Sequence, residues 1–357
     1  MAAAMAPVTA GLGGQAPGSP PPATQYLAAR KGRFVSNKSP SFGFFASSEE
    51  LGPDEIIRAA KTAEAAGFDR LWVSDHYHPW MSEQGSSPFV WSVLGALAST
   101  TQLKLTTAVT CPTFRIHPAI LAQATATTAV MAPGRFTFGV GTGEALNEHI
   151  LGDAWPPVSV RQARLTEALE IIRQLWTGEV VTYEGTYFTV HNAKLFTRPE
   201  TPPDILVSGF GPEATRLAAQ IGQGWISTSP DAEGMKTYRD AGGTGRTQAG
   251  AKICWAETEK EAKQTAHRLW GHQAGGGQLS QDAPMWMQYE AVAELTSPDD
   301  IAKTVPCGPD AAHAAEAIAE YVEAGYDEIY IAQMGPDQDS GIRFLAEEVL
   351  PLLNTGT

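Results

Sequence analysis

The feature that most constrains the fold of this chain is a regular alternation of strand-like and helix-like segments. Short runs rich in β-branched and aromatic residues predict strands, and each is followed by residues whose apolar positions recur at helical spacing. The clearest predicted helix runs from Val160 to Trp176, where the apolar residues share one face. Eight strand–helix units predict an α/β fold, a (β/α)8 (TIM) barrel rather than a doubly wound sheet. We expect the strands at residues 41–47, 68–75, 104–111, 135–141, 205–208, 224–228, 252–256 and 328–332.

Two segments depart from this alternation. Residues 1–38 are rich in Ala, Gly and Pro, and they lack both a basic start and a continuous apolar core. They predict a flexible N-terminal extension rather than a secretory signal. Residues 39–357 are predicted to form a single barrel domain, which an insertion interrupts around residues 258–325. This insertion is expected to be helical on both sides of a glycine-rich break at Gly275–Gly277.

The charge and the cysteines limit the classes of partner. Lys and Arg number 25 and Asp and Glu number 39, so the formal net charge is −14. An acidic surface repels phosphate backbones and anionic lipids, so we expect no binding to nucleic acid or to a membrane. Cys111, Cys254 and Cys307 form no Cys-x-x-Cys pair, so neither a disulfide framework nor a structural zinc site is predicted. The expected compartment is the cytoplasm, and a homodimer is left open as the assembly.

Polar residues gather where the predicted strands end. In a (β/α)8 barrel the active site lies at the carboxyl ends of the strands. The second strand ends in Asp75 and His76, followed by His78 and Trp80. Because an unperturbed imidazole titrates near neutral pH, His76 is a candidate general base, although it also fits a loop histidine that is only capped by its neighbours. A metal site formed by His76 and His78 lacks a third ligand at a recognisable spacing, so no metal is predicted.

The fourth and fifth strands end in segments that contain glycine. Glu144 follows Gly141-Thr142-Gly143, whose small residues allow a ligand to approach the backbone. Its carboxyl group fits a buried acid and equally fits an acidic residue at a helix start, and the sequence leaves both open. Ser208-Gly-Phe-Gly-Pro212 precedes a predicted helix, so its backbone N–H groups predict a phosphate site, with an ordinary strand–helix turn as the alternative.

Three motifs at these strand ends are specific when taken together. They are Ser74-Asp-His-Tyr-His-Pro-Trp80, Cys111-Pro-Thr-Phe-Arg115 with His117-Pro-Ala119, and Gly141-Thr-Gly-Glu-Ala-Leu-Asn-Glu148. In these motifs the chain resembles the luciferase-like superfamily of barrels, and within it the branch of the coenzyme F420-dependent glucose-6-phosphate dehydrogenases. The resemblance covers about residues 40 to 353. It implies a (β/α)8 barrel of the luciferase-like type, with the deazaflavin hydride carrier F420 as the cofactor.

The resemblance also implies roles for individual residues. His76 matches the family's proposed base, Glu144 its proposed acid and Trp80 an aromatic residue of the active site. The residues that match cofactor contacts are Asp75, Val109, Thr142, Gly143 and Asn147, and those that match the segment holding the cofactor phosphate are Ser208, Gly209 and Gly211. The family's non-proline cis peptide falls here between Ala108 and Val109, beneath the deazaflavin ring.

Three positions depart from the family pattern. The sugar-phosphate dehydrogenases hold the substrate phosphate with basic residues, and the matching positions here are Asp231, Gln278 and Thr304. A site that lacks these cations and gains a carboxylate binds a phosphomonoester poorly, so glucose 6-phosphate is not the expected substrate. The insertion instead carries an apolar run: Met285, Trp286, Met287 and Tyr289. If these side chains face the mouth of the barrel they favour an apolar or bulky substrate, and otherwise they only pack a helix.

Three functions are compatible with these residues. The leading hypothesis is an F420-dependent oxidoreductase that transfers a hydride between the deazaflavin and an alcohol or carbonyl carbon of a small molecule. The second is an FMN-dependent monooxygenase of the same superfamily, and the third is a barrel that binds a ligand without catalysis. Reduction of the cofactor and consumption of oxygen distinguish the first two, whereas the third predicts no turnover with any cofactor.

Overall fold

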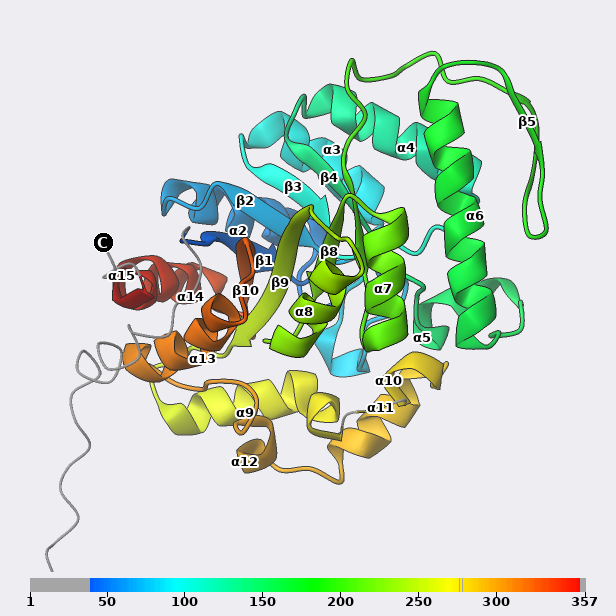
Figure 1. Ribbon diagram of the computed structural model, residues 1–357. Helices are drawn as coiled ribbons and strands as arrows, with labels where there is room; N and C mark the ends of the chain where they lie inside the picture. Colours follow the sequence, from blue (N-terminus) through cyan, green and yellow to red (C-terminus); the bar gives the residue numbers. More distant parts are fainter. Residues whose placement is uncertain (1–38, 276, 278, 354–357) are drawn as a thin grey trace, which may run out of the picture. The chain divides into compact units, whose positions relative to one another are not determined.

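The computed structural model describes residues 39–275, 277 and 279–353 (Figure 1). The predicted extension at residues 1–38 lies outside this range, so the division of the chain at residue 38 stays a prediction. Within the described part of the chain, no helix is both long enough and apolar enough to cross a bilayer.

Eight strands close into a barrel in the order β1-β10-β9-β8-β7-β4-β3-β2. Every neighbouring pair in this barrel is parallel. The arrangement confirms the predicted (β/α)8 fold and excludes a doubly wound sheet. The strands are β1 (Ser41–Ala46), β2 (Arg70–Val73), β3 (Lys104–Thr107), β4 (Phe136–Val140), β7 (Ile205–Ser208), β8 (Gly224–Ser227), β9 (Arg246–Ile253) and β10 (Glu328–Gln333).

Helices connect consecutive strands, as crossovers between parallel strands require. At the start of α4 (Pro118–Met131), His117 Nδ1 accepts a hydrogen bond from the Ala119 N–H, and Pro118 occupies the first helical position. The other connecting helices are α2 (Pro53–Ala65), α3 (Val90–Thr100), α6 (Val158–Trp176), α7 (Pro212–Ile221), α8 (Ala232–Asp240) and α13 (Ala311–Glu323). The chain closes with α14 (Gln338–Phe344), a π-helical turn (Leu345–Val349) and α15 (Leu350–Leu353). An antiparallel hairpin of β5 (Val181–Glu184) and β6 (Thr189–Ala193) extends beside α6 in Figure 1.

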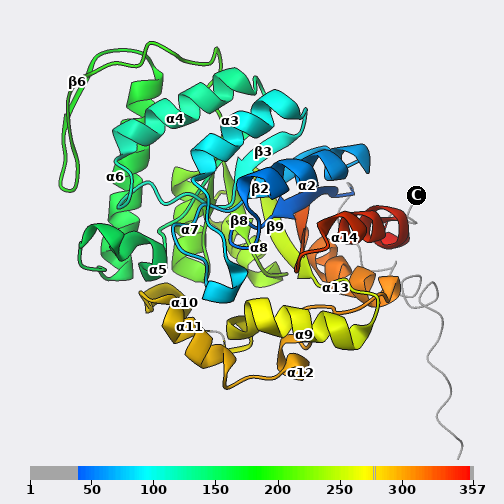
Figure 2. The same cartoon turned by 180° about the vertical axis from the view of Figure 1, so that it is seen from behind.

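The predicted insertion between β9 and α13 is helical, as expected. It consists of α9 (Glu259–Trp270), a 3₁₀ turn (Gly271–Gly275), α10 (Leu279–Asp282), α11 (Trp286–Ala293) and α12 (Pro298–Ile301). These helices pack on a turn after β2 (Ser82–Gln84) and on α5 (Ala145–Glu148), which follows β4. The insertion therefore lies over the carboxyl ends of the strands, at the bottom of the view in both Figures 1 and 2.

The seventh predicted strand is wrong in its position. It was expected at residues 252–256, but β9 runs from Arg246 to Ile253. The first half of β9 has no apolar run because its residues fill a crowded polar interior: Trp72 Nε1 donates to Gln248, and a Cβ on Gly250 would lie 2.6 Å from the Trp72 ring. The true position puts Lys252 near the carboxyl end of its strand rather than at the start. The helix before this strand, α8, was expected only as part of the strand–helix alternation, and its bounds were not predicted.

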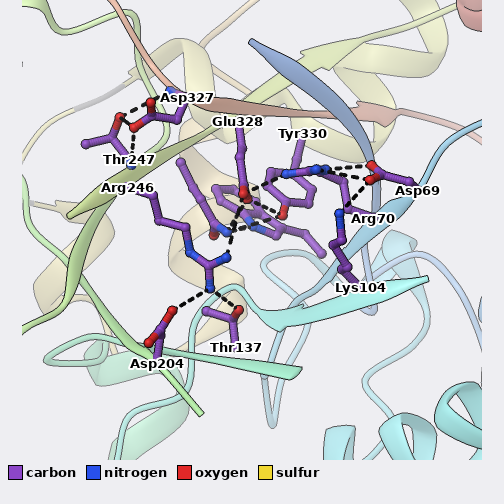
Figure 3. A network of polar contacts seen from close by, with 12 residues as sticks. Asp69, Arg70, Lys104, Thr137, Asp204, Arg246, Thr247, Asp327, Glu328 and Tyr330 are labelled. Carbon is purple, nitrogen blue, oxygen red and sulfur yellow. Dashed lines mark hydrogen bonds and ion pairs between the residues drawn. The ribbon is translucent and has the colours of Figure 1, made fainter. Parts of the chain in front are cut away.

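Two layers of side chains fill the barrel. The apolar layer consists of Phe45, Trp72, Leu206, Ile226, Tyr330 and Ala332, with Ala108 and Val109 packed against it. At the amino ends of the strands, a network of polar contacts closes the barrel (Figure 3). In this network Glu328 pairs with Arg70 at 2.6 Å and with Arg246 at 3.8 Å. The carboxyl ends of the strands therefore remain for a ligand site, and we call this end the mouth of the barrel.

Candidate active site

Asn147 of α5 holds the loop that follows β2 at the mouth. Its side-chain oxygen accepts hydrogen bonds from the N–H groups of Tyr77 (2.9 Å) and His78 (3.1 Å). Its amide nitrogen therefore faces His76 and lies 3.0 Å from Nδ1. Asn147 was expected to contact the cofactor. In this structure it positions the His76 loop, and the cofactor contact stays a prediction.

His76 has a partner at each ring nitrogen. Nδ1 lies 3.0 Å from Asn147 Nδ2 and 3.2 Å from the carbonyl oxygen of His78, and Nε2 lies 3.3 Å from Glu49 Oε1. With its proton on Nε2, the ring accepts from Asn147 at Nδ1. With its proton on Nδ1 donated to the His78 carbonyl, Nε2 is a free base beside Glu49. An N–H at either nitrogen thus has an acceptor, the His78 carbonyl oxygen or the Glu49 carboxylate, so the site can hold either tautomer, although the Asn147 amide donor favours the proton on Nε2.

Glu49 is a candidate functional residue that was not predicted from the sequence. It follows β1, and its Oε2 accepts from the hydroxyls of Ser47 (2.8 Å) and Ser74 (2.6 Å). Burial raises the pKa of this carboxyl, but His76 and the two hydroxyls outweigh burial, so its pKa is lowered overall. Glu49 therefore stays ionised and favours a proton on His76 Nε2. The sequence carried a signal for it, because Glu49 directly follows the carboxyl end of the first predicted strand.

A second missed group, Glu50 with Lys252, lies near Glu49. Glu50 accepts hydrogen bonds from the Trp270 indole N–H (2.5 Å) and from the Gly335 N–H (2.7 Å). Burial raises the pKa of Glu50 to about 7 against these two bonds. Burial lowers the pKa of Lys252 to about 8 against the charges of Glu49 and Glu50, and Lys252 Nζ lies 4.1 Å from the Trp270 ring centroid. Lys252 was missed because the predicted strand began at residue 252, which placed this residue at the amino end of the barrel instead of at the mouth.

Aromatic rings connect His76 to the insertion. The Trp80 ring lies 5.0 Å from the His76 ring, and it stacks on the ring of His272 at 5.4 Å. Tyr289 of α11 meets Trp80 edge-on at 5.2 Å. Of the other residues in the apolar run of the insertion, Trp286 lies 5.2 Å from the His78 ring, whereas Met287 is exposed. Part of that run therefore faces the aromatic residues of the mouth, and part of it faces away.

The Asp75 carboxylate is used inside the protein. Its Oδ2 accepts from the Thr110 hydroxyl (2.7 Å) and its Oδ1 from Arg115 (3.1 Å). Arg115 also donates to Glu148 through Nε, at 3.1 Å. Burial raises the pKa of Glu148 to about 7 although Arg115 opposes it. This buried network joins the segments after β2, β3 and β4, and the predicted contact between Asp75 and the cofactor stays a prediction.

Glu144 occupies the N-cap position of α5 and its side chain makes no capping hydrogen bond. It is half-buried, and its charge acts on Tyr289 and Arg161. Its position agrees with the expectation of an acidic residue at a helix start. The expectation that it acts as an acid on the cofactor stays a prediction.

Small residues lie where β3, β4 and β7 end. The Ala108–Val109 peptide bond is cis, at the position that the resemblance implies. A Cβ on Gly141 would lie 2.8 Å from Val109 Cγ2 and 3.7 Å from Ser208 Cβ, so the ends of the three strands approach one another here. The half-buried Thr142 and Gly143 continue the segment. These predicted cofactor residues therefore share one side of the mouth, and their contact with a cofactor stays a prediction.

Gly209 and Gly211 form the turn into α7. Gly211 has a φ of +78°, and a Cβ on Gly209 would lie 2.7 Å from the Ala214 backbone, so the turn needs glycine at both positions. The first N–H groups of a helix have no partner within it, which is the arrangement that binds a phosphate. The residues at the mouth thus fit a cofactor with a flat ring beside Ala108–Val109 and a phosphate at the start of α7. Across residues 39–275, 277 and 279–353, no three His, Cys, Asp or Glu side chains are grouped to hold a metal ion.

Two of the three positions that depart from the phosphate-binding pattern are described. Asp231 is the N-cap of α8, and its Oδ1 accepts from the Gly234 N–H at 2.7 Å. Thr304 donates its hydroxyl to the Ile301 carbonyl at 3.1 Å. Gln278 lies outside the described residues. Neither Asp231 nor Thr304 supplies a cation, and both have local structural partners.

Comparison with known proteins agrees with this arrangement. Residues 39–328 match the family described as luciferase-like monooxygenase. A relative named F420-dependent glucose-6-phosphate dehydrogenase, from Microbacterium testaceum (strain StLB037), is 38% identical over 325 residues, which are 87% of this chain and 97% of the relative. A protein of the same name from Nakamurella multipartita is 35% identical over 325 residues, which are 87% of this chain and 96% of that relative.

A solved structure gives the same fold. An F420-dependent secondary alcohol dehydrogenase in complex with an F420–acetone adduct superposes with a TM-score of 0.80 at 29% identity, covering 89% of this chain and 100% of that chain. Both the family match and the relatives confirm the resemblance seen in the strand-end motifs. The chain therefore belongs to the luciferase-like monooxygenase family, in the branch of the F420-dependent glucose-6-phosphate dehydrogenases.

Proposed function

We propose that this chain is an F420-dependent oxidoreductase that transfers a hydride between the deazaflavin and an uncharged alcohol or carbonyl compound. The observation that carries the proposal is the His76–Glu49 pair at a mouth lined by the Ala108–Val109 peptide and the glycines after β4, in a chain whose relatives are named F420-dependent. When bound, F420 accepts a hydride from an alcohol carbon or returns one to a carbonyl carbon. The chain itself has to move one proton from or to the substrate oxygen.

His76 moves this proton. In the oxidation of an alcohol, Nε2 takes the hydroxyl proton while Nδ1–H donates to the His78 carbonyl oxygen, 3.2 Å away. The Glu49 carboxylate, 3.3 Å from Nε2, stabilises the imidazolium that forms. In the reduction of a carbonyl compound, the same nitrogen returns the proton to the substrate oxygen.

The remaining predicted residues hold the cofactor. Ser208, Gly209 and Gly211 bind its phosphate at the start of α7, where the backbone N–H groups and the helix dipole favour an anion. Glu144 serves as the acid at the cofactor ring. The other contacts of the cofactor are made by Asp75, Ala108, Val109, Thr142, Gly143 and Asn147, and Trp80 is the aromatic wall of the site.

The charges near the mouth favour an uncharged substrate. The charge of Lys252 is offset by the neighbouring carboxylates of Glu49 and Glu50. Asp231 and Thr304 supply no cation. Recognition of a phosphomonoester relies on several charge-assisted hydrogen bonds. Acetone in the F420-dependent alcohol dehydrogenase supports propan-2-ol as a first substrate to test. Glucose 6-phosphate is the second candidate, because the relatives are named for it.

Two measurements test the proposal. In fluorescence titrations the purified chain should bind F420 more tightly than FMN, and equal or tighter binding of FMN would favour a monooxygenase instead. With F420 at saturation, propan-2-ol and cyclohexanol should reduce the cofactor, whereas glucose 6-phosphate should give no saturable reaction in the sub-millimolar range. A sub-millimolar KM for glucose 6-phosphate would replace the uncharged substrate by the phosphorylated one.

We also infer a cytoplasmic enzyme that binds no nucleic acid, and a homodimer is the assembly to be tested. Cys111, Cys254 and Cys307 are buried and unpaired, which suits a reducing compartment. The net charge of −14 opposes binding to nucleic acid. Light scattering of the purified chain measures its assembly, and a monomer at micromolar concentration would contradict the dimer.

A further inference from the structure

His272 is a buried histidine that the mechanism above does not use. It lies in the 3₁₀ turn between α9 and α10, and only 6% of its surface is exposed. Its Nδ1 is buried and has no hydrogen-bond partner within residues 39–275, 277 and 279–353. Burying a polar nitrogen without a partner is costly, so native structures contain few such atoms and each one calls for an explanation.

Aromatic rings fix the position of this imidazole. Its ring stacks on Trp80 at 5.4 Å with an interplanar angle of 20°, and it lies 5.8 Å from the Trp270 ring. Tyr289 meets it edge-on at 5.5 Å. Because Trp80 also contacts His76, the imidazole of His272 belongs to the same group of rings as the proposed catalytic histidine.

Burial, together with the neighbouring charges, keeps the ring of His272 neutral. Burial lowers the pKa of His272 to about 3, and the neighbouring charges of Lys252 and His76 lower it further. A neutral imidazole offers one donor and one acceptor, which suits a hydroxyl or a carbonyl group rather than an anion. Trp80, on which this ring stacks, lies 5.0 Å from the His76 ring, so His272 lies on the side of the insertion that faces the mouth.

We propose that Nδ1 of His272 forms a hydrogen bond with an oxygen of the uncharged substrate and so orients it beside His76. The proposal rests on the proposed function and adds a residue that selects the substrate. The rings of Trp80, Trp270 and Tyr289 pack around the imidazole and hold it in place. A substrate without a neutral hydroxyl or carbonyl oxygen at this position leaves the nitrogen unpaired.

Two substitutions separate the hydrogen bond from the packing. His272→Phe keeps a flat ring against Trp80 and removes the nitrogen, whereas His272→Gln keeps a group that can form hydrogen bonds. With F420 at saturation, His272→Phe should raise the KM for cyclohexanol roughly 10-fold, as expected when one hydrogen bond to the substrate is lost. His272→Gln should recover part of this loss. The Tm of His272→Phe should not fall, because no hydrogen bond inside the described protein is broken.

His267 is a matched control on the same insertion. Its Nε2 lies 2.9 Å from the Thr296 carbonyl oxygen and 3.2 Å from that of Ala293, so its ring already has partners inside the protein. His267→Phe should therefore lower the Tm and leave the KM for cyclohexanol unchanged. A purely structural role for His272 predicts the same pattern for both histidines.

The outcomes distinguish this inference from the proposed function. If the wild type oxidises cyclohexanol and His272→Phe has the same KM within about 1.5-fold, a water molecule or nothing is the partner of Nδ1 and the inference is wrong, while the proposed function stands. If the wild type oxidises no uncharged alcohol, the proposed function fails. Calorimetric titration of cyclohexanol into the chain with and without F420 then decides for His272: binding that His272→Phe weakens supports the inference, and absence of binding or equal binding overturns it.

Discussion

The two ends of the barrel bury charged side chains in opposite ways. At the amino ends of the strands, the Glu328 carboxylate pairs with the Arg70 guanidinium at 2.6 Å and accepts from the Tyr330 hydroxyl at 2.9 Å (Figure 3). At the mouth, the Glu50 carboxylate accepts hydrogen bonds from two N–H groups, yet burial raises its pKa to about 7. Burial also lowers the pKa of the neighbouring Lys252 to about 8. The amino end thus pairs its buried carboxylate directly with cations, whereas the mouth, beside the paired Asp75, Arg115 and Glu148, also keeps Glu50, whose pKa is about 7.

This difference separates stability from chemistry. A closed polar network at the amino end stabilises the barrel itself, whereas catalysis needs groups whose protonation changes at working pH. Two histidines at the mouth are also not fully compensated. His76 has an acceptor for an N–H at either nitrogen, and His272 has a buried nitrogen without a partner in the described residues. Substitutions at the two ends should therefore change different quantities.

The largest expected effect is at the mouth. His76→Ala removes the group that moves the substrate proton, so kcat should fall by roughly 10² to 10⁴, the usual range for a lost general base. The affinity for F420 should stay near that of the wild type. The Tm should fall modestly, since the buried Glu49 and Asn147 each lose a partner. Steady-state kinetics with propan-2-ol and a fluorescence titration with F420 measure the two quantities. A variant that keeps more than about half of the wild-type kcat would make His76 structural.

The opposite end predicts the reverse pattern. Glu328→Leu leaves the buried Arg70 and the half-buried Arg246 without their shared carboxylate. Asp69 and Asp204 remain as their acidic partners, and losing one partner of a buried pair in this way costs up to about 3 kcal/mol of the free energy of unfolding. The affinity of the folded fraction for F420 should not change, because this network lies at the end away from the mouth. Urea denaturation checks the stability. Glu257→Leu, at an exposed position, is the control and should be nearly neutral; equal losses in both variants would contradict a structural role for the network.

The fold could be predicted because its signals are local. Strand and helix periodicity is set by neighbouring residues, so the helix predicted from Val160 to Trp176 ends where α6 ends. Six of the eight strands lie entirely within their predicted ranges, and β10 extends one residue beyond its own. The predicted position of the seventh strand was wrong because tertiary packing overrides the local pattern there. Gln248 and Gly250 fit the Trp72 side chain inside the barrel, and neither has a high strand propensity. No neighbour in the sequence carries that information.

The site could be predicted only where a motif marks it. His76, Glu144 and Asn147 follow strand ends, and the strand-end rule finds them from the sequence alone. The same rule reaches Glu49, which was missed although its signal was present. Lys252 was lost through the misplaced strand, and His272 carries no signal, since its place beside Trp80 depends on how the insertion folds back over the mouth.

A smaller effect depends on pH. The pKa of Glu50 is raised to about 7, so the stability that its protonated form contributes is present below the ordinary value near 4.5 and is lost as the pH rises through 7. Glu50→Gln does not titrate. The free energy of unfolding of Glu50→Gln minus that of the wild type should therefore increase between pH 5 and pH 8, by on the order of 1 to 3 kcal/mol.

Urea denaturation at both pH values measures this difference, and the exposed Glu257→Gln is its control. The wild type and Glu50→Gln share the other titrating groups of the mouth, including Glu49, Lys252 and His76, so these largely cancel in the comparison. A difference between the two proteins that is the same at pH 5 and pH 8 would show that Glu50 is ionised throughout, and that the mouth compensates its charges as the amino end does.

The smallest effect concerns a residue near the mouth whose task is structural. Asp231 follows β8 and caps α8 through the Gly234 N–H, at 2.7 Å. Asp231→Ala removes this cap and should lower the free energy of unfolding by about 1 kcal/mol, whereas Asp231→Asn keeps a good cap and should cost less than half of that.

Because Asp231→Asn removes the negative charge alone, it also tests whether that charge excludes phosphorylated substrates. If Lys or Arg is needed at this position, glucose 6-phosphate should remain unreactive in the Asn variant. Saturable turnover of glucose 6-phosphate by Asp231→Asn, with unchanged stability in Asp231→Ala, would move Asp231 from the helix cap to the substrate site.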